Sequence, residues 1–282
     1  MSRERGTRRD RGWKSLTIRE EDGVSWVTID RVEDRNSLDS ETIAELRRHL
    51  EATEKTDARA VVYRGAGGTH FIGGADGVEM YEMAPDGARQ FSRRIQELFT
   101  RMESSPLYLI AAIDGLCFGG GLEFALACDL RLASETARLG LPEVKLGIIP
   151  GGGGTQRLPR VVGFGRSVEM VLGGRLVASD EALRIGLITA VVPAAELEER
   201  AAEVARRIAA IPRHALAAAK RAVYASRDLP LAQGLSLEAD RFAECFKESY
   251  FADRVREQLA DGRLTTTRER TQEGKAGKHA DA

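Results

Sequence analysis

Two glutamates beside glycine-rich turns are the residues of this 282-residue chain that are best suited to acid–base chemistry. Glu123 directly follows Gly119-Gly120-Gly121, where a helix is expected to begin, and Glu143 follows Leu141-Pro142 in an expected loop. A helix N-terminus offers unpaired N–H groups and a positive dipole end, and glycines let a ligand approach the backbone closely. Such a turn can stabilise a developing oxyanion, although a carboxylate in a first helical turn also has an ordinary structural explanation.

Other kinds of site find little support in the sequence. The run from Pro150 to Gly154 lacks the ending of a P-loop, so turn geometry at a helix entrance is the favoured interpretation. Three scattered cysteines favour buried, reduced thiols rather than disulfides or zinc ligands. The histidines have no metal-ligand spacing, and we expect no metal site. They are His49, on an expected surface helix, and His70, His214 and His279.

The overall charge argues against several classes of partner, although it leaves room for a local basic patch. Lys and Arg total 42 against 43 Asp and Glu, which gives a formal net charge of -1. This balance argues against bulk electrostatic attraction to nucleic acid or anionic membranes. The basic N-terminus lacks the apolar stretch of a secretory signal, and no apolar run is long enough to span a bilayer. We therefore expect a cytoplasmic protein that binds neither nucleic acid nor membrane.

Apolar runs that alternate with helical patterns predict an α/β fold with a mostly parallel, helix-covered sheet. After Phe164 the pattern becomes almost wholly helical. Four segments are expected: a mobile basic N-terminus over 1–12, a core over 13–210, a helical region over 211–264 and a disordered polar tail over 265–282. The strands are expected at 16–18, 24–29, 60–63, 107–113 and 130–133.

The spaced motifs of the central segment occur in a fixed order. They are Gly115-x-x-x-Gly119-Gly120-Gly121-x-Glu123, Ala127-Cys128-Asp129, Leu141-Pro142-Glu143-x-x-x-Gly147 and Pro150-Gly151-x-Gly153-Gly154-Thr155-Gln156-Arg157-Leu158. Upstream lie Arg31, Asn36-Ser37-Leu38 and the loop Phe71-Ile72-Gly73-Gly74-Ala75-Asp76. Together these motifs closely resemble the enoyl-CoA hydratase/isomerase, or crotonase, superfamily, and they are most similar to its enoyl-CoA hydratases.

The resemblance implies a fold and an assembly that the residue pattern alone does not reveal. The implied fold is a crotonase-like spiral of ββα repeats forming two nearly perpendicular sheets, with a C-terminal helical region used in trimer contacts. A homotrimer, or a hexamer made as a dimer of trimers, is therefore expected.

The resemblance also implies a binding mode for an acyl-CoA thioester. The thioester carbonyl would lie between the backbone N–H groups of Gly73 and Gly120, because two donors can stabilise an enolate oxygen. The loop residues Gly74, Ala75 and Asp76 would shape the acyl and pantetheine entrance. The adenine and phosphates would lie nearer the segment formed by Asp34, Arg35, Ser37 and Leu38.

Both carboxylate positions that distinguish hydratases within the family are occupied here, by Glu123 and Glu143. By analogy they jointly hold one water: Glu123 helps to activate it for attack at the β carbon, and Glu143 exchanges the proton at the α carbon. Two close carboxylates cannot both ionise freely, so the pair supplies one acid and one base. The reaction needs no cofactor, since coenzyme A is part of the substrate.

Two departures from the family pattern leave other functions open. Gly73 stands where Ala or Ser is common, which would loosen the loop or widen the pocket, and the stretch after Phe246 lacks the usual hydratase ending. Hydration of a 2-enoyl-CoA is the first hypothesis. The alternatives are double-bond isomerisation, decarboxylation or carbon–carbon cleavage through the same enolate, or a non-catalytic binding protein with this fold.

Overall fold

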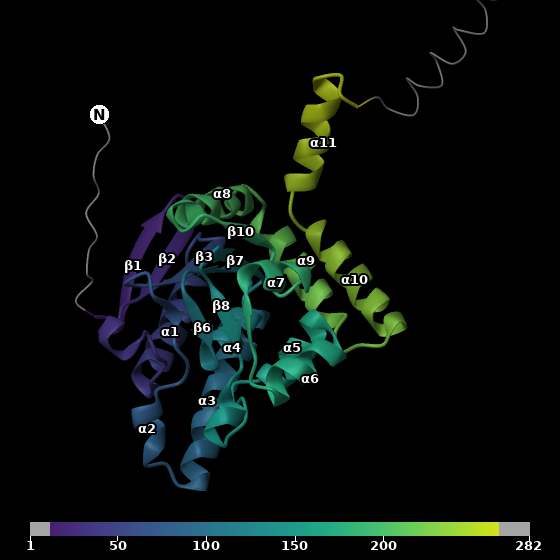
Figure 1. The fold of residues 1–282 in the computed structure, drawn as a ribbon. Helices are drawn as coiled ribbons and strands as arrows, with labels where there is room; N and C mark the ends of the chain where they lie inside the picture. The colour runs from purple at the N-terminus through teal and green to yellow at the C-terminus, as the bar shows by residue number, and fades with distance from the viewer. Residues whose placement is uncertain (1–11, 265–282) are drawn as a thin grey trace, which may run out of the picture. The chain divides into compact units, whose positions relative to one another are not determined.

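A computed structural model of the chain describes residues 12–264 (Figure 1). The described chain divides into two compact units, one ending at Ala217 and the other beginning at Ala218. Apart from Gly12, the expected mobile N-terminus and disordered tail lie outside the described residues.

A six-stranded sheet forms the centre of the first unit, in the order β1-β2-β3-β5-β7-β10. Only the β1–β2 pair is antiparallel, and the other neighbours in this sheet run parallel. The strands are β1 (Leu16–Glu21), β2 (Val24–Ile29), β3 (Ala60–Gly65), β5 (Tyr108–Ile113), β7 (Leu130–Ser134) and β10 (Ala190–Val192).

A second sheet has four short strands in the order β4-β6-β8-β9, and β9 runs antiparallel to β8. They are β4 (His70–Ile72), β6 (Leu116–Phe118), β8 (Arg138–Gly140) and β9 (Leu176–Ala178). The residue pattern alone predicted one sheet, which was wrong, and an almost wholly helical stretch after Phe164, which also contains the short strands β9 and β10. Each missed strand has three residues, too few to establish an alternating pattern.

Strands of the two sheets alternate along the chain: β3 and β4, β5 and β6, then β7 and β8 each place the first strand in the large sheet and the second in the small one. Each pair is followed by helix, which produces the ββα repeats that the resemblance implied. The helices of this unit are α1 (Ser40–Thr53), α2 (Gly77–Tyr81), α3 (Pro85–Ser104), α4 (Gly120–Ala127), α5 (Gly154–Val162), α6 (Phe164–Leu172), α7 (Ser179–Arg184) and α8 (Leu197–Ala209). Three 3-10 helices complete it: η1 (Val32–Asp34), η2 (Glu143–Leu146) and η3 (Ala194–Glu196).

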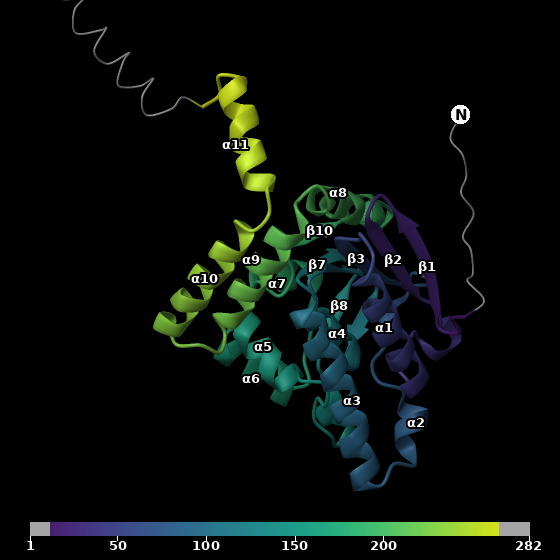
Figure 2. The same cartoon turned by 180° about the vertical axis from the view of Figure 1, so that it is seen from behind.

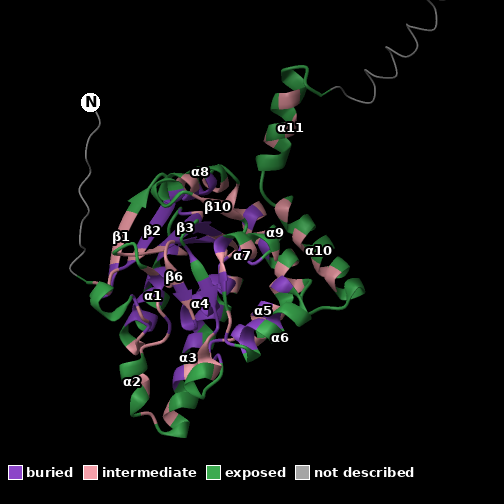
Figure 3. Cartoon of the chain, in the orientation of Figure 1, coloured by how far each residue is buried: buried purple, intermediate pink, exposed green. Residues whose placement is uncertain are grey.

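The large sheet is buried on both faces, as the continuous apolar runs of its parallel strands require. Within β3, Val61 and Tyr63 join the core cluster that contains α4, whereas Ala60 and Val62 join the cluster formed with α8. Every residue of α4 is buried, and Figure 3 shows this helix in the middle of the buried region. The first turn of α4, which carries Glu123, therefore lies at the centre of the unit.

Two polar side chains of α1 are buried against the N-terminal hairpin. Glu45 accepts hydrogen bonds from the backbone N–H groups of Lys14 and Ser15, both at 2.9 Å. His49, expected on the surface, is buried and lies 2.9 Å from the Ser25 hydroxyl, and burial lowers its pKa to about 4. His49 thus belongs to the interior of the fold, because α1 packs this face against the hairpin.

The C-terminal region is helical, as expected. Helix α9 (Arg213–Ala225) leads into α10 (Leu231–Cys245) and α11 (Tyr250–Ala260), which Figure 2 shows from behind. Phe246 packs edge-on against Phe242 and Phe251, with ring centroids 5.0 and 5.2 Å away.

Candidate active site

The turn before α4 has a conformation that only glycine readily adopts. Gly119 has φ +50° and ψ −121°, and its N–H donates to the Gly140 carbonyl in the neighbouring strand β8 at 2.9 Å. Gly120 is the first residue of α4, so its N–H has no acceptor within the helix. The turn thus leaves the first N–H of α4 without an acceptor in that helix.

The Glu123 carboxylate is held by the second glycine-rich loop. Its Oε1 accepts hydrogen bonds from Gly152 N–H at 2.8 Å and Gly154 N–H at 2.7 Å. A Cβ atom at Gly152 would lie 2.6 Å from Glu123 Oε2, so a side chain there would collide with the carboxylate. Sequence reasoning assigned this loop only to turn geometry. It missed that the loop binds Glu123, because the two segments are 29 residues apart.

The surroundings of Glu123 act on its ionisation in opposite directions. Burial raises the pKa of this side chain, which is only 2% exposed. The N–H groups of Gly154 and Gly152 and the positive charge of Arg157 oppose that rise because they stabilise the ionised form, but the net shift of the pKa remains upward.

Glu143 begins η2, and its carboxylate lies against the other glycine turn. A Cβ atom at Gly119 would be 3.1 Å from Glu143 Oε1, so the turn leaves space for this carboxylate. Glu143 Oε2 is buried without a hydrogen-bond partner among the described residues. Burial, with a smaller contribution from the charge of Glu123, raises the pKa of Glu143 to about 7. The fold therefore brings the two predicted carboxylates into one electrostatic unit.

The segment after β4 is fixed by the chain that precedes α1. Gly73 N–H donates to the Arg35 carbonyl at 2.9 Å, and a Cβ atom at Gly73 would lie 2.8 Å from the same oxygen. The expectation that Gly73 supplies an oxyanion donor is therefore wrong, because its N–H already has an acceptor. Glycine at this position permits a close backbone approach, and the missing methyl does not simply widen a pocket.

Ala75 offers a backbone donor in place of Gly73. Its N–H has no acceptor within residues 12–264, and this nitrogen would lie 3.0 Å from a Cβ atom at Gly120. Ala75 also forms a parallel bridge with Leu38, in which Leu38 N–H donates to Gly74 O and Asp76 N–H to Leu38 O, at 2.8 and 2.9 Å. Ala75 and Gly120 thus lie in adjacent segments, each with an N–H group that has no backbone acceptor among residues 12–264.

Asp76 has a structural use that the sequence did not reveal. Its side chain accepts hydrogen bonds from Val78 N–H and Glu79 N–H at the start of α2, and it pairs with Arg31 at 3.2 Å. Partial burial raises the pKa of Asp76, but these N–H groups and Arg31 outweigh it, so the net shift is downward. Asp76 therefore holds the Gly73–Ala75 loop in place with a carboxylate that stays ionised.

The segment expected near the coenzyme lies beside this loop. Asp34 pairs with Arg31, the Ser37 hydroxyl donates to the Asp34 carbonyl, and the Leu38 side chain is fully buried. Arg35 is exposed, with a positive φ of 59°. Of these residues, Leu38 contributes to the core and to the bridge with Ala75. The charged side chain of Arg35 is exposed and therefore accessible to solvent or a ligand.

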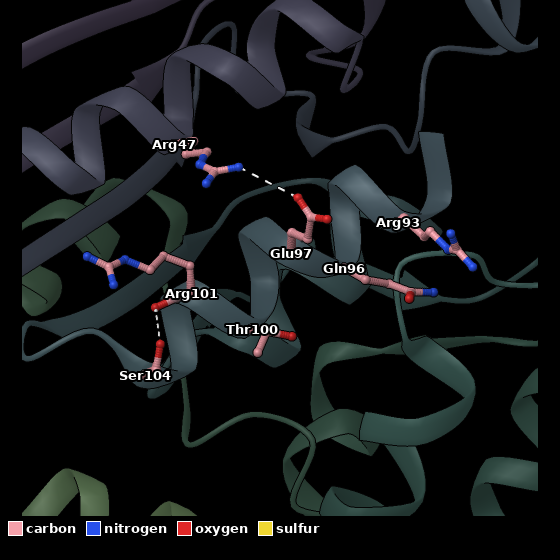
Figure 4. Close-up of a pocket in the computed structure, with 7 residues that line it drawn as sticks. All are labelled: Arg47, Arg93, Gln96, Glu97, Thr100, Arg101 and Ser104. Atoms are coloured by element: carbon pink, nitrogen blue, oxygen red, sulfur yellow. Dashed lines mark hydrogen bonds and ion pairs between the residues drawn. The ribbon is translucent and has the colours of Figure 1, made fainter. Parts of the chain in front are cut away.

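A surface hollow of about 520 Å³ is lined by residues of α3 and by Arg47 of α1. Figure 4 shows these side chains. Arg47 of α1 faces Glu97 across it at 3.6 Å. None of the predicted site residues lines this hollow. Within the described residues, no group of three His, Cys, Asp or Glu side chains is placed to hold a metal ion. No described helix is both long and apolar enough to cross a membrane.

Comparison with known proteins identifies the family of this chain. The enoyl-CoA hydratase/isomerase family model matches residues 19–257. The chain belongs to this family. A short-chain-enoyl-CoA hydratase of Clostridium acetobutylicum is 39% identical over 233 residues, which cover 82% of this chain and 89% of the relative. A crotonyl-CoA hydratase of Syntrophomonas wolfei is 34% identical, covering 83% and 90%.

Solved structures agree with this assignment. The crystal structure of an enoyl-CoA hydratase from Bacillus anthracis matches with a TM-score of 0.83 and 35% identity, covering 90% of this chain and 98% of that one. The crotonase-like α/β fold and the expectation of an enoyl-CoA hydratase-like enzyme are thereby confirmed at the level of the family.

Proposed function

We propose that this protein reversibly hydrates a 2-enoyl-CoA thioester to a 3-hydroxyacyl-CoA. The observation that carries the proposal is the pair of glutamates at one site: buried Glu123 is held by two backbone N–H groups, and half-buried Glu143 has one oxygen without a hydrogen-bond partner among the described residues. Isomerisation needs only a proton carrier, whereas addition of water needs a second group to hold and activate the water. Hydration makes use of both carboxylates.

The thioester carbonyl would bind between the N–H groups of Ala75 and Gly120. When water adds at the β carbon, the α carbon gains electron density, and the resulting enolate places negative charge on the carbonyl oxygen. Two donors already fixed by the fold can stabilise that charge by about 3 kcal/mol each. The close approach of the two segments and the absence of other acceptors support this assignment.

The two carboxylates would divide the proton transfers. Glu123, whose oxygen accepts two N–H hydrogen bonds, takes a proton from the attacking water, while protonated Glu143 delivers one to the α carbon. A pKa of about 7 suits Glu143 to this exchange near neutral pH. After turnover the proton rests on Glu123, and transfer back to Glu143 restores the starting state. The reverse reaction uses the same groups in the opposite order.

The coenzyme would run from the Gly74–Asp76 loop toward the segment containing Asp34, Arg35 and Ser37. Exposed Arg35 supplies a cation for a phosphate group there. The names of the relatives, short-chain and crotonyl-CoA hydratase, support a short acyl chain as the first choice of substrate.

The direct experiment follows loss of the conjugated thioester absorbance of crotonyl-CoA with purified protein. We expect turnover by the wild type, and reductions of at least about 10²-fold in Glu123→Gln and Glu143→Gln. If the wild type leaves every 2-enoyl-CoA unchanged but isomerises a 3-enoyl-CoA or decarboxylates a malonyl-type thioester, hydration is the wrong reaction. Turnover of none of these thioesters, with a ligand bound elsewhere, would favour a binding protein.

A trimer, or a dimer of trimers, is part of the same proposal and rests on the family resemblance. Light scattering of the purified chain tests it: the 30.8 kDa protomer would appear at three or six times that mass. A monomer at working concentration would contradict it.

A further inference from the structure

Arg157, in the first half of α5, makes a set of contacts that the proposed reaction does not yet use. Its Nη1 donates to the Gly152 carbonyl at 2.9 Å, and its Nη2 pairs with Glu103 of α3 at 2.9 Å. Both charged side chains are largely buried, at 12% and 17% exposure. A buried arginine with such partners is fixed in position, because the two buried charges stabilise each other.

The same glycine joins Arg157 to the reacting carboxylate. Gly152 receives Arg157 on its carbonyl and donates its own N–H to Glu123. The next residue, Gly153, has φ +107°, and a Cβ atom there would lie 2.3 Å from Arg157 Nη1. The guanidinium therefore occupies the space beneath the loop, and the direction of the Gly152 N–H depends on it.

We propose that Arg157 is a positioning residue for Glu123, holding the loop 151–154 so that its N–H groups meet the carboxylate and placing a positive charge behind them. The proposal rests on the proposed function, in which Glu123 must be ionised to take a proton from water. It assigns to Glu103 the matching role of anchoring Arg157 to α3.

The charges around Glu123 determine the direction in which its pKa should change when Arg157 is replaced. Glu143, on η2, disfavours a second negative charge in the site, whereas Arg157, on α5, favours ionisation of Glu123. Glu103, on α3, partly neutralises Arg157. Loss of the Arg157 charge should therefore raise the pKa of Glu123, and the acidic limb of kcat/KM should move to higher pH.

Three variants separate charge from geometry. Arg157→Met removes the positive charge and the hydrogen bonds of the guanidinium. The double variant Arg157→Met with Glu103→Gln removes the same features together with the negative charge of Glu103. Arg157→Lys keeps the charge but cannot contact Gly152 and Glu103 through one planar fork. Arg160→Met is the matched control, since Arg160 is exposed on the same helix and donates to Gln156 O rather than to the loop.

We expect kcat to fall about 10²-fold in Arg157→Met and in the double variant with Glu103→Gln, with little change in KM. In both, the acidic limb of kcat/KM should move to higher pH by about one pH unit. Arg157→Lys should lose about tenfold in kcat while keeping the wild-type limb. Arg160→Met should match the wild type in both. A folded double variant with the wild-type kcat and pH profile would overturn the proposal.

A titration of ¹³C-labelled glutamate carboxyls by NMR separates failure of this proposal from failure of the proposed function. Comparison with Glu123→Gln identifies the Glu123 resonance, and its pKa in Arg157→Met should lie above the wild-type value whether or not the protein turns over an enoyl-CoA. An unchanged pKa would overturn the electrostatic part. An inactive wild type that still shows the shift would contradict only the hydration reaction.

Discussion

The Glu123 carboxylate accepts hydrogen bonds from two backbone N–H groups, whereas that of Glu143 lies at the start of a short 3-10 helix and has one oxygen without a partner in the described part of the chain. Burial raises the pKa of both carboxyls; the loop N–H groups of Gly152 and Gly154 oppose that rise at Glu123, whereas at Glu143 it is opposed by a hydrogen bond from the residue's own backbone N–H. Two identical side chains are therefore prepared for different roles by the loops around them. In the proposed reaction, these different surroundings, rather than residue type, distinguish the base from the acid.

The largest expected effect comes from removing the base. Glu123→Gln keeps an oxygen for the N–H groups of Gly152 and Gly154 but cannot accept a proton, so we expect kcat for crotonyl-CoA hydration to fall by about 10³-fold or more. Circular dichroism should show an intact fold. A variant within tenfold of the wild type would mean that Glu123 is not the base.

The loop that holds Glu123 can be disturbed without substituting either glutamate. A methyl group at Gly152 would lie 2.6 Å from Glu123 Oε2 and 2.9 Å from Phe99 Cε2, so Gly152→Ala should displace the carboxylate and reduce kcat by about 10²-fold. Gly151→Ala is the control, since its methyl would meet only Ser92, at 3.7 Å. Equal activity of the two variants would show that the loop does not position Glu123.

Ionisation of Glu143, the proposed acid, should appear in the pH dependence of kcat/KM. Because Glu143 must carry a proton and its pKa is about 7, kcat/KM should fall roughly tenfold per pH unit at higher pH. Hydration and dehydration should share this limb, since both need the pair with one proton. The residual activity of Glu143→Gln should lack it. A limb that persists in that variant would belong to another group.

The smallest effect concerns stability. The folded-state pKa of Glu143 is raised from 4.5 to about 7. The favourable contribution of its protonated form to the free energy of unfolding is therefore present below pH 4.5 and is lost as the pH rises through 7. Glu143→Gln should therefore raise the Tm by about 2–4 °C at pH 8 and change it little at pH 4. A lower Tm at pH 8 would mean that the ionised carboxylate has a favourable partner.

Much of the large sheet could be predicted from sequence, because its buried strands are long apolar runs: β2 was expected at 24–29 and β3 from residue 60. The small sheet could not, since three-residue strands such as β4 leave no periodic signal. The family motifs, rather than periodicity, led to the spiral. His49 shows the same limit, because its burial comes from a hairpin distant in sequence.

The site was predictable only in part, for a similar reason. Glu123, Glu143 and Gly120 could be named from motifs, but the acceptor of the Gly73 N–H depends on Arg35, 38 residues earlier in the chain. The use of Gly152 and Gly154 to hold Glu123 likewise arises from a contact between separate repeats. Sequence identifies which groups are present, and the fold decides which of their hydrogen bonds remain available.

The central claim is that two unequal carboxylates work as one pair, and a double-mutant cycle on kcat tests it most directly. Crotonyl-CoA hydration would be measured for the wild type, Glu123→Gln, Glu143→Gln and the double variant. Groups that act as a unit give non-additive losses, so the double variant should be no more than about tenfold slower than the worse single variant. Losses that multiply would show that the two glutamates act independently and would contradict the account.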